Sequence, residues 1–62
     1  MKCAALIRAE HCRDMAAHFR CLAETEPLAI LRRHLRRLAG QHDEMAAKLE
    51  AARRGRAAAE DA

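Results

Sequence analysis

Aromatic residues are nearly absent from this 62-residue chain, which has one Phe and neither Trp nor Tyr. Valine is missing and threonine occurs once, so residues that favour β-strands are scarce. Hydrophobic residues make up 52% of the chain, but many of them are alanine, which buries little apolar area. A chain this short buries only about 60% of the surface that its unfolded form exposes. We therefore expect a small scaffold that a partner completes, without a deep enzyme pocket.

Long apolar runs are also missing. No stretch approaches the roughly 18 apolar residues that suggest a transmembrane helix, and Arg8 and Glu10 interrupt a short N-terminal run that briefly imitates a signal peptide. The three cysteines contain no C-x-x-C pair, which excludes a zinc ribbon or a thioredoxin-like site. These features predict a cytoplasmic protein with reduced thiols, no membrane span, no enzymatic activity, no cofactor and no small-molecule substrate.

Chain breakers are few, since the sequence has one Pro and two Gly. Ala, Leu, Arg, Glu and Met dominate instead, and all favour helix. The only internal break surrounds Pro27, which suits the first position of a helix, with Glu26 as N-cap and Thr25 as the alternative. We predict an all-α antiparallel hairpin over residues 1–54, with helices over about 2–23 and 27–53, a turn over 24–26, and a frayed tail over 55–62.

Apolar residues recur at alternating spacings of three and four, which is a heptad pattern. In the second helix the stripe comprises Leu28, Leu31, Leu35, Leu38, His42, Met45, Leu49 and Ala52. In the first helix it comprises Ala4, Ile7, His11, Met15, His18 and Leu22, flanked by Cys12 and Phe19. The predicted interface therefore consists of the larger apolar side chains, Ile7, Met15, Phe19, Leu22, Leu28, Leu31, Leu35, Leu38, Met45 and Leu49.

This arrangement would bring His11 close to Leu38 and His42. Two helices alone leave one side of the apolar stripe open, and pairing two hairpins closes it. We expect a homodimeric four-helix bundle, or assembly with another helical protein. The corresponding function is protein–protein interaction or a structural role.

The segment R-A-E-H-C-R-D-M-A at residues 8–16 resembles a pattern of small helical hairpins that are abundant in alphaproteobacteria, especially rhizobia. The acidic proline turn over 24–27 and the stretch L-R-R-L-A-G-Q-H-D-E-M-A over 35–46 extend this resemblance across about residues 7–50. It implies a two-helix hairpin and no established biochemical function. His42 departs from it, because those proteins usually carry an aromatic residue at that position. In topology and length the chain is also similar to the plasmid RNA-binding hairpin dimer Rop.

Two alternative functions follow from polar side chains. Four arginines, Arg32, Arg33, Arg36 and Arg37, cluster at the start of the second helix, where they could contact a phosphate backbone in RNA or DNA. Zinc-ligating side chains also recur, with His11, Asp14 and His18 on one edge of the first helix and His42 across the interface. The second alternative is a metal-binding helical module, although neither H-E-x-x-H nor repeated E-x-x-H motifs occur.

Overall fold

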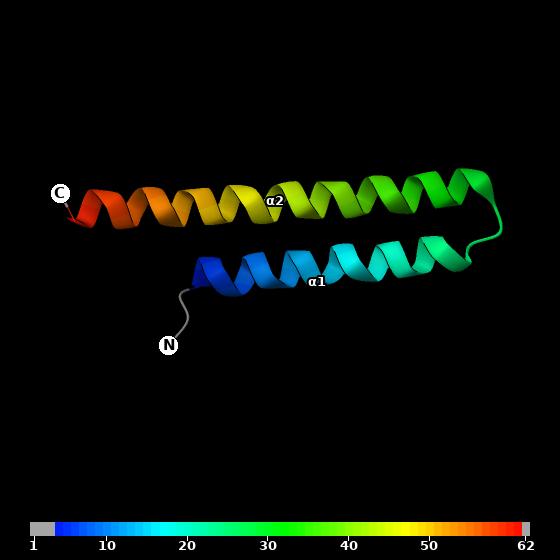
Figure 1. The fold of residues 1–62 in the computed structure, drawn as a ribbon, viewed down its shortest axis with the longest axis horizontal. Helices are drawn as coiled ribbons and strands as arrows, with labels where there is room; N and C mark the ends of the chain where they lie inside the picture. The colour runs from blue at the N-terminus through cyan, green and yellow to red at the C-terminus, as the bar shows by residue number, and fades with distance from the viewer. Residues whose placement is uncertain (1–3, 62) are drawn as a thin grey trace.

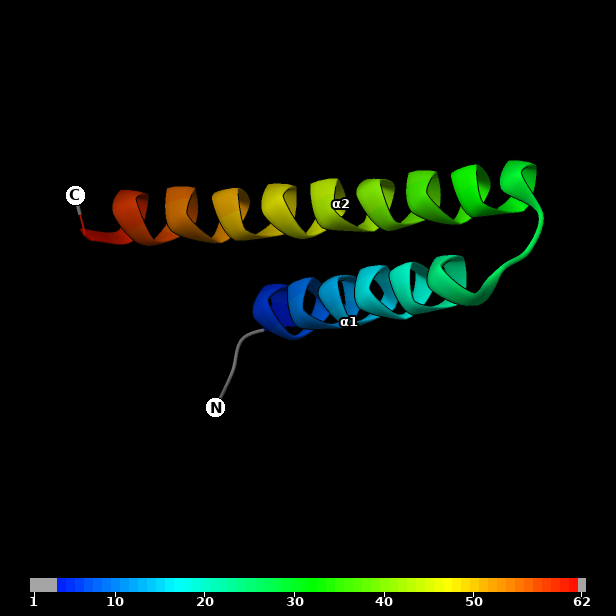
Figure 2. The ribbon, with the colours of Figure 1, turned by 45° about the vertical axis from the view of Figure 1, so that its right-hand side comes forward.

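The computed structural model describes residues 4–61, which form two α-helices: α1 (Ala4–Thr25) and α2 (Ala29–Asp61). The helices lie side by side and run antiparallel (Figure 1), and the view turned by 45° shows the same pairing (Figure 2). The Cα atoms extend over 52 × 19 × 11 Å, so the molecule is flat. This arrangement confirms the predicted all-α hairpin.

The end of α1 is closed by local hydrogen bonds. The Thr25 hydroxyl donates to the Leu22 carbonyl at 3.3 Å, and the Glu26 amide donates to the Ala23 carbonyl at 3.4 Å. These bonds satisfy carbonyl groups that the last helical turn would otherwise leave without partners. The helix therefore reaches Thr25, two residues beyond the predicted end.

The start of α2 lies at Ala29 rather than at Pro27. The Arg32 amide donates to the Leu28 carbonyl at 2.9 Å, which makes Leu28 the N-cap. A Glu26 carboxylate oxygen accepts a 3.2 Å hydrogen bond from the Leu28 amide. The Arg32 guanidinium donates to the carbonyls of Glu26 and Pro27, both at 3.0 Å. These contacts hold residues 26–28 outside the helix, so the predicted N-cap was two residues early.

The C-terminal part of α2 continues to Asp61 and extends past the beginning of α1 (Figure 1). The part of the predicted tail that the structure describes, from residue 55 to Asp61, is therefore helical. Alanine and arginine favour helix here, and Gly55 lies inside the helix, where its cost of about 1 kcal/mol relative to Ala is insufficient to end it. Residues 1–3 and 62 of the predicted ranges lie outside the described residues.

Small side chains fill the contact between the two helices. Five alanines lie at the contact with almost no exposed surface: Ala9, Ala16, Ala23, Ala39 and Ala46. We call these residues the alanine seam. Their spacing is seven residues within each helix, which keeps them on one helix face. Cys12, 7% exposed, lies among them. Because a methyl group occupies little space, such a seam allows the helix axes to approach closely.

The large apolar side chains are only partly buried at this contact, where Leu49 packs against the buried cluster and Phe19 lies against His42 of the other helix. Five of the predicted interface residues are exposed, namely Ile7, Leu22, Leu28, Leu31 and Met45. The other five are half-buried, namely Met15, Phe19, Leu35, Leu38 and Leu49. In α2, two members of the predicted stripe, His42 and Leu49, also lie at the helix contact. Two others, Leu38 and Met45, each precede a residue of the alanine seam by one position. One residue corresponds to a rotation of about 100° around the helix, so much of the stripe lies beside the seam.

Candidate interaction surface

One side of the alanine seam is bordered by charged residues, which we call the charged flank: Arg13, Arg20, Asp43 and Glu50. Each follows a seam alanine by four residues, which places it about 40° to one side of that alanine. Arg13 forms a two-bond ion pair with Glu50, in which Nη2 lies 2.9 Å from Oε2. Arg20 pairs with Asp43 across the same edge.

The ion pair of Arg13 and Glu50 changes the proton affinity of both groups. The hydrogen bond from Arg13 holds the pKa of the Glu50 carboxyl below its ordinary value, aided by the positive charges of Arg13, Arg54 and Arg53. The same hydrogen bond raises the pKa of Arg13. Exposed ion pairs add little stability. We therefore assign this edge the role of fixing how the two helices align.

The other side of the seam carries a row of apolar residues, which we call the apolar flank: Met15, Leu22, Leu31, Leu38 and Met45. Four of them precede a seam alanine by one residue, which rotates them away from the charged flank. Leu22 and Leu31 are each 42% exposed and Met45 is 49% exposed. This face therefore presents a row of aliphatic side chains from each helix to its surroundings.

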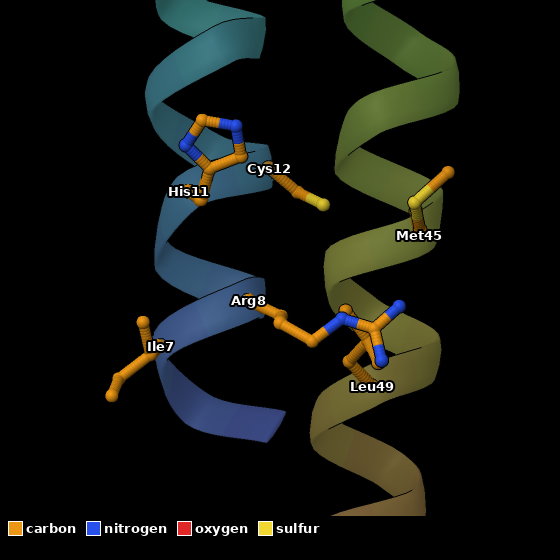
Figure 3. A pocket seen from close by; sticks show the side chains of 6 residues that line it. All are labelled: Ile7, Arg8, His11, Cys12, Met45 and Leu49. Atoms are coloured by element: carbon orange, nitrogen blue, oxygen red, sulfur yellow. The ribbon is translucent and has the colours of Figure 1, made fainter. Parts of the chain in front are cut away.

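A groove of about 420 Å³ indents the apolar flank away from the turn. Its walls are Ile7, Arg8, His11 and Cys12 from α1 and Met45 and Leu49 from α2. The Cys12 sulfur points toward α2, and the Arg8 side chain extends in the same direction (Figure 3). Most of the lining is apolar, so the groove is suited to receive an aliphatic side chain.

The histidines do not meet as predicted. The His42 ring lies against Phe19, with centroids 5.2 Å apart, and its Nδ1–H donates to the Leu38 carbonyl 2.8 Å away. His11 instead lines the groove, and His18 and Asp14 are exposed. Within residues 4–61, no three His, Cys, Asp or Glu residues are grouped so that they could hold a metal ion. The predicted metal ligands are therefore not brought together in the single chain.

The arginine cluster at the start of α2 divides into two parts. Arg32 is half-buried and holds the turn through its two carbonyl contacts. Arg33, Arg36 and Arg37 are exposed. Only these three retain the exposure that the nucleic-acid alternative requires, because contact with phosphate would compete with the structural role of Arg32.

Neither the alanine seam nor the charged flank was predicted from the sequence. A detectable signal was present, because alanines recur at 9, 16 and 23 and at 39 and 46, while Arg13 and Arg20 share the seven-residue spacing of Asp43 and Glu50. Opposite charges in matching heptad positions indicate helix faces that pair.

Comparison with known proteins gives no match to a family model, a curated protein or a solved structure. The resemblance to rhizobial hairpins therefore rests on the sequence pattern alone, and the similarity to Rop rests on topology and length alone. Over residues 4–61, neither helix is sufficiently long and apolar to cross a membrane.

Proposed function

We propose that this protein is a small, non-catalytic interaction module whose apolar flank is covered by another helical surface. The observation that carries the proposal is the division of the hairpin into a charged flank and an apolar flank. On the charged flank, polar side chains already pair within the chain. On the apolar flank, Leu31 and Met45 are 42% and 49% exposed.

The energetic reason is the cost of leaving aliphatic side chains in water. Full burial of a Leu or Met side chain contributes about 1.5–3 kcal/mol, and the exposed part of each residue represents a share of that energy. Contiguous exposed apolar surface marks interaction sites in soluble proteins. A helical partner fits because the flank consists of two parallel rows of side chains with a groove, the shape that a helix pair completes in a four-helix bundle.

Hydroxyl-radical footprinting tests this proposal with an internal control. Leu31 and Ile30 are neighbouring aliphatic residues in α2, but Leu31 belongs to the apolar flank, whereas Ile30 is 74% exposed and lies outside it. In an extract of cells that make the protein, we expect Leu31 and Met45 to be oxidised at least about threefold more slowly than in the same chain dissolved in denaturant. Ile30 should be only weakly protected. Equal protection of Leu31 and Ile30 would contradict a covered apolar flank.

A further inference from the structure

We infer that the partner on the apolar flank is a second copy of this chain, bound about a two-fold axis with the two turns at opposite ends. This inference rests on the proposed function, because it names the partner of the same surface. The product is a four-helix bundle in which the alanine seams lie within each hairpin and the apolar flanks lie between the hairpins.

The exposed surface area of the hairpin fits a partner of its own size. A compact folded monomer of 7.0 kDa exposes about 4,000 Å², whereas this hairpin exposes 4900 Å². The difference, about 900 Å², is close to the roughly 800 Å² that each partner buries in a stable interface. The broad face, 52 × 19 Å between Cα atoms, or about 1,000 Å², is large enough to bury this area. One further hairpin is therefore of the right size.

The shape of the apolar flank fits a second copy of the same flank. Leu22 and Leu31 project from the apolar flank near the turn, while the groove beside Cys12 and Met45 lies toward the other end. A two-fold axis near Met15, midway along the flank, places the projecting leucines of each copy over the groove of the other. Because projection and groove belong to the same face, one interface satisfies both copies, as an isologous dimer requires.

The distribution of charge favours two copies with their turns at opposite ends. The five residues that define the apolar flank carry no charge, and Arg8 and His11 are the basic side chains that line its groove. The exposed Arg33, Arg36 and Arg37 lie close to the turn. With both turns at one end, the two sets of arginines would be neighbours and would repel each other. Opposite turns place the two sets of arginines on opposite sides of the two-fold axis.

The mass in solution tests the pairing. Light scattering with refractive-index detection on the full chain at about 100 µM should give twice 7.0 kDa. Leu31→Asp should weaken dimerisation on the order of a hundredfold, since each dimer then loses two buried leucines and gains two charges. Ile30→Asp, the matched change one residue away, should leave the dimer intact. A wild-type mass of 7.0 kDa, or equal effects of the two substitutions, would overturn the inference.

If the chain unfolds when the dimer dissociates, thermal unfolding still tests the dimer. In that case the wild-type melting temperature should rise with protein concentration, as it does for a dimer that folds and assembles together. The Ile30→Asp variant should show the same dependence. A wild-type melting temperature that does not change over a hundredfold range of concentration would exclude the dimer.

Spin labels test the arrangement. A label on Thr25→Cys in a Cys3→Ser, Cys21→Ser background lies about 15 Å along the helix from Met15. Opposite turns therefore predict a label separation of about 30 Å by double electron–electron resonance, because the axis doubles this offset. A separation below about 20 Å, the width of two helices, would show turns at the same end and overturn the arrangement.

Failure of the dimer and failure of the proposed function are distinguishable. If Leu31 is protected in the cell extract but oxidised as fast as Ile30 in the purified protein, the flank binds a different protein and the second copy is excluded. If Leu31 is unprotected in both samples, the proposed function fails as well.

Discussion

Enlarging a residue of the alanine seam should destabilise the hairpin, and Ala16→Leu is the most informative change. Ala16 is completely buried against the opposite helix. Leu and Ala differ little in helix propensity, so a change in stability would report packing between the helices. The matched control is Ala17→Leu, since Ala17 is the next residue of the same helix and is exposed.

The expected magnitude follows from the space available. Three extra carbons would contribute about 0.8 kcal/mol each if the site could accommodate them. The seam has no such room, because the Ala16 methyl is already enclosed. Forcing a larger side chain into a packed contact typically costs about 1–3 kcal/mol. For a chain of this size, each 1 kcal/mol lowers the melting temperature by about 4–8 °C.

Thermal unfolding followed by far-ultraviolet circular dichroism, with all variants at one protein concentration, measures this difference. We expect Ala16→Leu to melt about 5–20 °C below the wild type, and Ala17→Leu to melt within about 3 °C of it. If the leucine stripe formed the contact within the chain, the added side chain would border that stripe and add apolar contact. Melting of Ala16→Leu at or above the temperature of Ala17→Leu would therefore refute the alanine seam.

Three further predictions concern other parts of the hairpin. Arg13 lowers the pKa of Glu50 in the folded state. The Glu50 carboxylate therefore stabilises the fold at pH values above its unfolded pKa of about 4.3, and this stabilisation is lost as the pH falls through the lower pKa of the folded state. Glu50→Gln should thus melt below the wild type at pH 7 and together with it near pH 2; an equal difference at both pH values would contradict this linkage. Cys21 is exposed and Cys12 is buried, so iodoacetamide should alkylate Cys21 at least about tenfold faster, as judged by peptide mass spectrometry; equal rates would contradict the burial of Cys12. Gly40 lies within α2 with no atom within 4 Å of an added Cβ, so Gly40→Ala should stabilise the fold by about 1 kcal/mol in urea unfolding, and a loss of stability would show an unrecognised contact.

The sequence predicted the two helices and their antiparallel pairing because helix formers and a single proline leave few alternatives. It did not identify which faces meet. Leucine dominates any hydrophobic pattern, so one leucine stripe was assigned both to the contact within the chain and to the pairing of two hairpins. In the structure, alanine occupies the centre of that contact, where its small size permits close approach, and the larger apolar side chains lie beside it, partly buried or exposed.

The turn between the helices was also predicted only in part. Pro27 correctly indicated the break between the helices. The exact start of α2 also depends on the Arg32 side chain, which donates hydrogen bonds to two backbone carbonyls of the turn. Local propensities contain no information about that contact, so the helix boundary moved by two residues. The groove on the apolar flank was likewise not predictable, because it depends on the relative rotation of the helices.

An isotope-filtered nuclear Overhauser experiment tests the central claim most directly, namely that the apolar flank joins two copies while the alanine seam stays within one. Mixing ¹³C-labelled and unlabelled protein restricts the observed signals to contacts between chains. We predict intermolecular signals from the methyl groups of Met15 and Leu38 and none from those of Ala16 and Ala39. Intermolecular signals at Ala16 and Ala39, or an absence of intermolecular signals at Met15 and Leu38, would contradict the account.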